Sequence, residues 1–122
     1  MPRLSNNIAL ADTNILIYSV RQKIDLIGEV KSLSFNLVTS TCVMEELSKL
    51  SHRNAYAKIA KDVYSEIEVV HGEGLGDDCI LDACSKNNLV LISNDRILCD
   101  RAMKKGIAVL NIEDGRKLTW RR

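Results

Sequence analysis

The sequence predicts a three-layer α/β fold, formed as a single domain over residues 1–122. Apolar runs of four or five residues alternate along the chain with segments of helical periodicity. This alternation is typical of buried parallel strands joined by right-handed helical crossovers. The length suits one hydrophobic core, and the one proline is Pro2, so nothing divides the chain into separate units.

The first predicted unit is a strand at Ile8–Ala11 that leads through Asp-Thr-Asn into a helix with apolar residues from Ile15 to Val20. The same change from strand to helix recurs along the chain. The other predicted strands are Phe35–Thr39, Ile67–His71, Leu89–Ser93 and Ile107–Leu110, and the other predicted helices are Cys42–Leu50, Ala55–Ser65, Asp77–Lys86 and Asp95–Lys105.

Composition excludes several classes of protein. Hydrophobic residues make up 46% and charged residues 27%, which favours a soluble globular domain over a disordered or fibrous chain. The longest apolar stretches, Ile8–Ala11 and Leu89–Ile92, are too short to span a bilayer, so we expect a cytoplasmic protein with no membrane contact. A net charge of +1 gives no overall attraction to nucleic acid, and any such attraction must come from local clusters.

The four cysteines lie in apolar segments and lack the paired C-x-x-C spacing of a zinc or redox site. We interpret all of them as reduced core residues. They are Cys42, Cys79, Cys84 and Cys99.

Acidic residues stand where strands lead into helices, the edge at which α/β sheets bind ligands. Asp12 follows the first strand, Asp77 and Asp78 open a helix after the Gly72–Gly76 loop, and Asp95 follows the fourth strand. Ordinary helix capping is an alternative for each of these acids. The loop lacks the Lys-Ser/Thr ending of a nucleotide site, so we interpret it as a flexible approach to Asp77.

Helical geometry places Asp77 and Asp78 on different faces of their helix, because successive residues are rotated by about 100°. Ile80, Ala83 and Cys84 form an apolar stripe, and Asp77 lies at its edge. Asp78 projects to the opposite side, as a cap or as a partner of the other acids.

Glu46 gives a sharper case. Val43, Leu47 and Leu50 define a core-facing stripe, and Glu46 falls within its angular range. A core-facing carboxylate is costly unless it is paired, protonated or bound to a cation. No basic residue lies on that stripe, so the pattern predicts a metal.

Several carboxylates at one rim favour a hard divalent cation, and ligands made only of oxygen indicate Mg²⁺ or Mn²⁺ rather than zinc. Two such ions about 4 Å apart can activate a water for phosphodiester cleavage. This chemistry needs no histidine, so we interpret His52 and His71 as bystanders.

Four segments occur in an order that resembles the PIN domains: Asp12–Asn14, Cys42–Leu50, Gly76–Ile80 and Ser93–Arg96. That family has an Asp after the first strand, a Glu on a helix and two later Asp residues. The likeness covers nearly the whole chain and is nearest to the branch of small-subunit ribosomal RNA processing nucleases and their archaeal relatives. Toxin ribonucleases of toxin–antitoxin pairs are more distant.

The resemblance implies that the chain is an endoribonuclease that cuts RNA with a metal-activated water and leaves a 5′-phosphate and a 3′-hydroxyl. It also implies a doubly wound sheet of about five strands, homodimerisation, and an antitoxin or a ribosome-assembly partner. The implied catalytic and metal-binding acids are Asp12, Glu46, Asp77 and Asp95. The residues expected to orient them through hydrogen bonds are Asn14, Asp78, Ser93 and Asn94.

Basic residues on the helix after Asp95 are candidates for contact with the RNA backbone, and a solvated helix face is the alternative. In the basic tail, Arg116–Arg122, Trp120 either stacks on an unpaired base or packs on the domain or a partner subunit. The candidate RNA-binding residues are Arg96, Arg101, Lys104 and Lys105.

Three other functions compete with the nuclease. A non-catalytic RNA- or protein-binding assembly module would retain the same fold. A phospho-accepting receiver domain would need an Asp and a Lys where His71 and Asn111 stand. A phosphatase with an Asp nucleophile would need Asp-x-Asp-x-Thr after the first strand, where this chain reads Asp12-Thr13-Asn14-Ile15.

Overall fold

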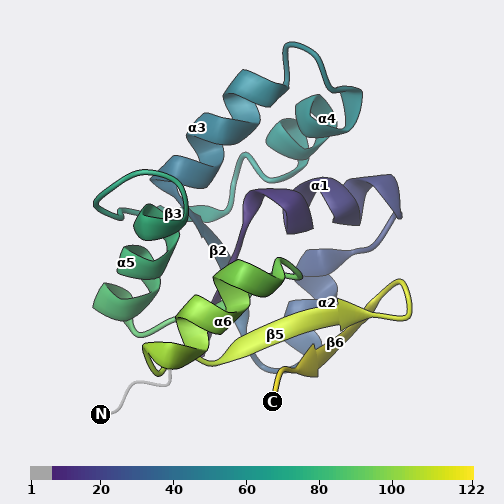
Figure 1. The fold of residues 1–122 in the computed structure, drawn as a ribbon. Coiled ribbons are helices and arrows are strands. Elements are labelled where there is room, and N and C mark those ends of the chain that lie inside the picture. The colour runs from purple at the N-terminus through teal and green to yellow at the C-terminus, as the bar shows by residue number, and fades with distance from the viewer. Residues whose placement is uncertain (1–6) are drawn as a thin grey trace.

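The computed structural model describes residues 7–122, which form one six-stranded sheet flanked by helices (Figure 1). The strands lie in the order β3-β2-β1-β4-β5-β6, and all neighbours are parallel except β5 and β6. The prediction of a mostly parallel α/β fold is confirmed, with one strand more than expected. The strands are β1 Ile8–Ala11, β2 Asn36–Ser40, β3 Glu68–Val70, β4 Val90–Ile92, β5 Val109–Glu113 and β6 Lys117–Trp120.

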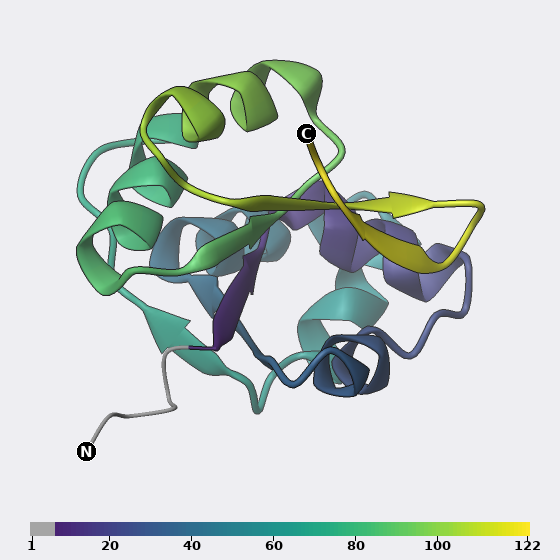
Figure 2. The same ribbon diagram turned by 90° about the horizontal axis from the view of Figure 1, so that it is seen from below.

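Helices cover both faces of this sheet. Helices α5 and α6 lie on one side, and α1, α2 and α4 lie on the other (Figure 2). Helix α3 packs against α1 and α4 and also touches α5. The bounds are α1 Thr13–Arg21, α2 Leu26–Ser32, α3 Thr41–Leu50, α4 Ala55–Val63, α5 Asp77–Asn87 and α6 Arg96–Lys104.

The central strands read as unbroken apolar runs because both of their faces are covered. Ala9, Leu10 and Ala11 of β1 are fully buried, as are Leu91 and Ile92 of β4. Every helix within residues 7–122 is too short or too polar to cross a bilayer.

Two elements were not predicted. Helix α2 has only seven residues, with Leu26 and Val30 as its buried positions, so its periodicity is too brief to recognise. Its start is fixed by Asp25, whose carboxylate accepts a hydrogen bond from the Gly28 N–H at 3.1 Å.

Strand β6 pairs antiparallel with β5 through a tight turn in which Asp114 and Gly115 have φ of 52° and 84°. An Asp-Gly pair is a hairpin signal that the sequence analysis did not use. The Trp120 ring meets Phe35 edge-on, with 5.9 Å between centroids. Of the alternatives for the basic tail, the structure therefore shows Trp120 packed on the domain.

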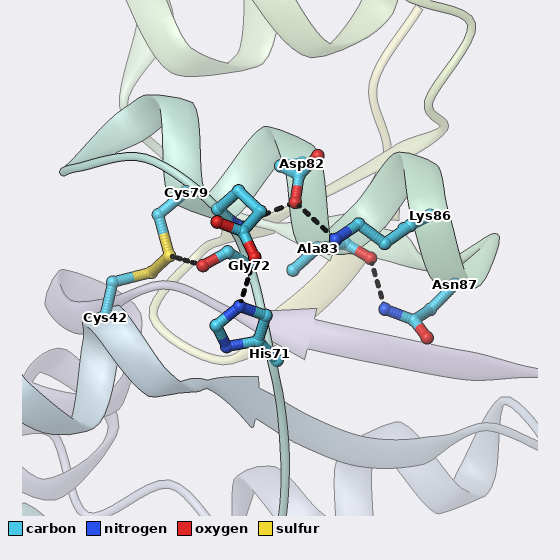
Figure 3. Close-up of polar contacts among 9 residues, drawn as sticks. Cys42, His71, Gly72, Cys79, Asp82, Ala83, Lys86 and Asn87 are labelled. Atoms are coloured by element: carbon cyan, nitrogen blue, oxygen red, sulfur yellow. Dashed lines mark hydrogen bonds and ion pairs between the residues drawn. A yellow bond between two sulfur atoms is a disulfide. The ribbon is translucent and has the colours of Figure 1, made fainter.

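The prediction that all four cysteines are reduced is wrong for Cys42 and Cys79. These two residues form a disulfide that joins the first turn of α3 to the first turn of α5 (Figure 3). They are 37 positions apart in sequence and become neighbours only because both helices begin at the same edge of the sheet. Cys84 and Cys99 are buried free thiols, and burial raises the pKa of Cys84 to about 12.

Candidate active site

The strand order places the first acid at the switch point of the sheet. The chain runs outward from β1 to β2 and β3 and then returns to β4 on the other side of β1. Crossovers therefore diverge above β1 and β4, which is where open α/β sheets bind ligands. Asp12 follows β1 directly and Ser93 follows β4 directly, so the two side chains meet there.

Asp12 is a buried carboxylate, 4% exposed. Its Oδ1 accepts a hydrogen bond from the Ile15 N–H at 2.9 Å, and its Oδ2 accepts one from the Ser93 hydroxyl at 2.5 Å. Burial raises the pKa of Asp12 to about 6, against the lowering effect of these two hydrogen bonds. The negative charges of Asp95 and Asp77 contribute smaller parts of that rise, so the site favours the arrival of positive charge.

Ser93 connects two of the acids. Its hydroxyl donates to Asp12 and accepts a hydrogen bond from the backbone N–H of Asp95 at 3.0 Å. Its own carbonyl accepts a hydrogen bond from the Asn111 side chain at 2.7 Å. Asn111 was missed as a supporting residue, although a lone amide within the apolar strand Val109–Glu113 is a usable signal.

Asp95 is exposed and caps α6, because its Oδ1 accepts a hydrogen bond from the Leu98 N–H at 3.1 Å. Asp12 caps α1 in the same way, so for both residues the capping alternative holds together with a place in the site. The Asn94 side chain exchanges two hydrogen bonds with the Ile112 backbone, at 2.9 and 3.1 Å. Asn94 therefore fixes the segment before Asp95 against β5 rather than touching an acid in the described part of the chain.

The prediction that Glu46 faces the core is wrong. Val43 and Leu47 are buried, but Glu46 is exposed beside them, because α3 extends past the end of β2 and its flank meets solvent. The Thr13 hydroxyl donates a hydrogen bond to Glu46 Oε1 at 2.6 Å. Thr13 is a second residue that the sequence analysis missed, and its burial next to Asp12 could not be foreseen from spacing.

Asp77 is half-buried at the first position of α5, directly after Gly76, whose φ is 58°. Burial raises the pKa of Asp77, the negative charge of Asp95 adds to that rise, and Arg101 opposes it. Asp78 is exposed and forms an ion pair with Arg101 at 2.6 Å. Asp78 therefore pairs with the Arg101 side chain at the edge of the site rather than with a neighbouring acid.

The loop before Asp77 is fastened at its beginning rather than free. The Glu73 N–H donates a hydrogen bond to Asp82 at 2.7 Å, and the Cys79 sulfur lies 3.4 Å from the Gly72 carbonyl oxygen (Figure 3). A Cβ at Gly72 would lie 2.2 Å from the Cys79 carbonyl, so only glycine fits this approach. The loop that leads to Asp77 is therefore held in place at Gly72 and Glu73.

All four predicted acids, Asp12, Glu46, Asp77 and Asp95, line one pocket of about 170 Å³, with Thr13 and Asn14 on the same wall. Their donor atoms are all oxygens, which suit Mg²⁺ or Mn²⁺. Within residues 7–122, however, no group of three or more acids, histidines or cysteines is placed closely enough to hold a metal ion. The donor chemistry of the four acids fits a hard cation, whereas their side chains as they lie here are not clustered closely enough to hold one.

The predicted RNA-binding residues divide into two groups. Arg96 is exposed beside Asp95, at the site end of α6. Arg101 is paired with Asp78, and Lys104 and Lys105 are exposed at the far end of the helix, about 13 Å away along its axis. Arg96 therefore adjoins Asp95, Arg101 lies at the Asp77 and Asp78 edge of the site, and the two lysines lie away from it.

Comparisons with known proteins agree with this architecture. A family model described as a PIN like domain matches residues 9–114. Ribonuclease VapC9 of Archaeoglobus fulgidus is 31% identical in an alignment of 117 residues that covers 90% of this chain and 86% of that protein. The rRNA-processing protein fcf1 of Schizosaccharomyces pombe is 34% identical in an alignment of 110 residues that covers 84% of this chain and 57% of that protein.

Two solved structures share the fold. The PIN domain endonuclease Utp24 superimposes with a TM-score of 0.74 at 24% identity, covering 93% of this chain and 92% of that one. VapBC-1 from nontypeable Haemophilus influenzae gives a TM-score of 0.61 at 20% identity, covering 80% of this chain and 93% of the other.

Proposed function

Since the chain belongs to the PIN-like domain family, we propose that it is a divalent-cation-dependent endoribonuclease that hydrolyses RNA phosphodiester bonds. The observation behind this proposal is the pocket in which Asp12, Glu46, Asp77 and Asp95 converge. A buried carboxylate surrounded by three others is stabilised by a cation, and phosphodiester hydrolysis is the chemistry that such oxygen-only sites perform.

The chain's own residues have distinct tasks in this proposal. Asp12 is the fixed cation ligand, because Ser93 and the Ile15 N–H determine where its two oxygens point. Glu46, Asp77 and Asp95 complete the ligand set from α3, α5 and the start of α6. When bound, Mg²⁺ or Mn²⁺ neutralises the phosphate and activates water. Arg96, beside Asp95, is placed to contact the RNA backbone.

In the reaction, the oxygen of a water forms a bond to phosphorus while the bond from phosphorus to the 3′ oxygen breaks. The leaving 3′ oxygen takes a proton, and the products are a 5′-phosphate and a 3′-hydroxyl. The 2′-hydroxyl does not take part, so RNA with one 2′-deoxy residue before the cleaved bond should still be cut.

The direct test is cleavage of labelled single-stranded and structured RNAs with Mn²⁺, Mg²⁺ or EDTA. We expect metal-dependent cutting that Asp12→Asn abolishes and that Glu46→Gln strongly reduces. Glu45→Gln is the matched control, because Glu45 is the exposed neighbour of Glu46 on α3 and this substitution removes the same charge. Intact RNA in the presence of bound metal would contradict the nuclease.

A non-catalytic assembly module is the second candidate. The observation that favours it is that no three acids among the described residues are already placed to hold a metal. Calorimetric titration with Mn²⁺ distinguishes the two: the nuclease requires binding that Asp12→Asn removes, and the module requires RNA or protein binding that survives the same variant.

The relatives suggest two biological roles, ribosomal RNA processing and a toxin-type ribonuclease. For either role we propose a cytoplasmic protein that forms a homodimer. Affinity capture of the Asp12→Asn variant separates them. Recovery of ribosomal RNA precursors would support processing with an assembly partner, and recovery of one small protein at equal stoichiometry would support an antitoxin.

A further inference from the structure

A second hollow adjoins the acid pocket. It measures about 340 Å³ and shares Asn14 and Asp95 with that pocket. Its other walls include Tyr18 and Arg21 of α1 and the apolar side chain of Ile17. A chain bound across the acids would therefore continue directly into this space, which we call the Tyr18 hollow.

Helix α1 arranges the polar side chains of the hollow in a row. Asn14, Tyr18 and Arg21 are separated by four and three residues, so they lie along one face of the helix. Each step of one helical turn advances roughly 5 to 6 Å, about the length of one nucleotide in an extended strand. The row begins with Asn14 at the acid pocket and ends with the positively charged side chain of Arg21.

The chemistry of this row suits a nucleotide. The Tyr18 ring is half-buried against the core, which holds it in place, and the Arg21 guanidinium carbon lies 5.6 Å from its centroid. Arg21 forms no ion pair within residues 7–122, whereas Arg101 is paired with Asp78 and Arg121 with Asp100. The guanidinium lies over the Tyr18 ring in a cation–π contact, so a base that stacks on this face must displace it, and the displaced guanidinium can bind the adjoining phosphate.

We propose that the Tyr18 hollow binds one unpaired nucleotide of the RNA, adjacent to the bond that is cut, with its base against Tyr18 and its phosphate on Arg21. The inference rests on the proposed function, which supplies the RNA at the neighbouring acids. It adds a nucleotide subsite outside the four acids, one that a paired base cannot enter.

Binding in EDTA tests the hollow without cleavage. The readout is fluorescence anisotropy of a labelled single-stranded RNA, whose affinity we expect to fall about tenfold in Tyr18→Ala and to be retained in Tyr18→Phe, because stacking needs the ring and not the hydroxyl. Tyr56→Ala is the matched control, since Tyr56 is a tyrosine exposed on α4. Equal affinities of the wild type and a folded Tyr18→Ala would overturn the proposal.

Two further arms are independent of any effect of Tyr18→Ala on folding. Replacing the exposed Arg21 by Gln should reduce the slope of log affinity against log salt by about one, as expected for one lost phosphate contact. An abasic residue moved along the RNA should weaken binding at one position, and that loss should vanish in Tyr18→Ala. An unchanged slope, or an abasic penalty that is the same in both proteins, would contradict the hollow.

These results separate the hollow from the nuclease. Cleavage by the wild type together with Tyr18-independent binding would refute the hollow and leave the proposed function standing. Tyr18-dependent binding without any metal-dependent cleavage would refute the nuclease and support the hollow.

Discussion

The acid pocket has two unlike halves. On the sheet half, Asp12 is 4% exposed and both of its oxygens have hydrogen-bond donors, from Ser93 and from the backbone of α1. On the helix half, Glu46 is exposed and accepts a single hydrogen bond from the residues at positions 7–122, that of Thr13. The sheet half is thus positioned before any ligand arrives, whereas the helix half depends on where α3 and α5 lie.

The disulfide acts on the helix half alone. Cys42 lies one helical turn before Glu46, and Cys79 lies two residues after Asp77. The covalent link therefore ties together the two helix starts that hold these acids, while Asp12 and Ser93 are held by adjacent strands. The comparison predicts that the two halves respond to different perturbations.

Reduction of the disulfide should have the largest effect on stability. The disulfide closes a loop of 37 positions, so the Cys42→Ala/Cys79→Ala variant should lose about 3 to 4 kcal/mol of unfolding free energy. Urea denaturation monitored by circular dichroism measures this loss. The affinity for Mn²⁺ should also fall, because Glu46 and Asp77 are no longer held together.

The control for that experiment is dithiothreitol. It should lower the stability of the wild type and leave the double variant unchanged, since Cys84 and Cys99 are already free thiols. A double variant as stable as the wild type would show that the link between α3 and α5 contributes nothing.

Asp12 should make the apo protein less stable as the pH rises. Its pKa is raised from 3.8 to about 6 in the folded state, so folding favours the protonated form. This contribution is complete below pH 3.8 and is lost as the pH rises through 6, a difference of about 3 kcal/mol. In EDTA, Asp12→Asn should therefore match the wild type near pH 3.5 and exceed its stability at pH 7.

The measurement is urea denaturation of both proteins across this range, repeated with Mg²⁺. Bound cation should restore the wild type at pH 7 and leave Asp12→Asn unaffected. Parallel curves for the two proteins at all pH values would mean that Asp12 is not held in a charge-disfavouring environment.

The sheet half was also the half that sequence patterns could predict. Asp12 and Asp95 follow strands at a switch point, and that rule depends only on the order of elements. Glu46 was placed on the wrong surface because a helical wheel gives the direction of a side chain but not where the neighbouring sheet ends. The partners of Ser93 and Cys42 lie 81 and 37 positions away, and spacing contains no information about such contacts.

Ser93→Ala should slow cleavage about 10- to 100-fold, because it removes the group that orients Asp12. In the wild type the Ser93 hydrogen bond lowers the pKa of Asp12, so its loss raises that pKa and keeps Asp12 protonated to higher pH in the variant. The deficit should accordingly be larger at pH 6 than at pH 8. Ser65→Ala, at an exposed serine, is the control, and a deficit independent of pH would point to a general loss of structure instead.

Thr13→Val should have the smallest effect. The valine keeps the shape of the buried threonine but removes the hydroxyl that donates to Glu46, an exposed carboxylate that water can solvate in its place. We expect the activation free energy of cleavage to rise by about 1 kcal/mol, which slows the reaction roughly fivefold. Thr13→Ser should keep full activity. Rates for the two variants under identical metal conditions provide the measurement. A loss in Thr13→Val as large as that in Ser93→Ala would mean that the helix half is as firmly positioned as the sheet half, and the distinction between them would fail.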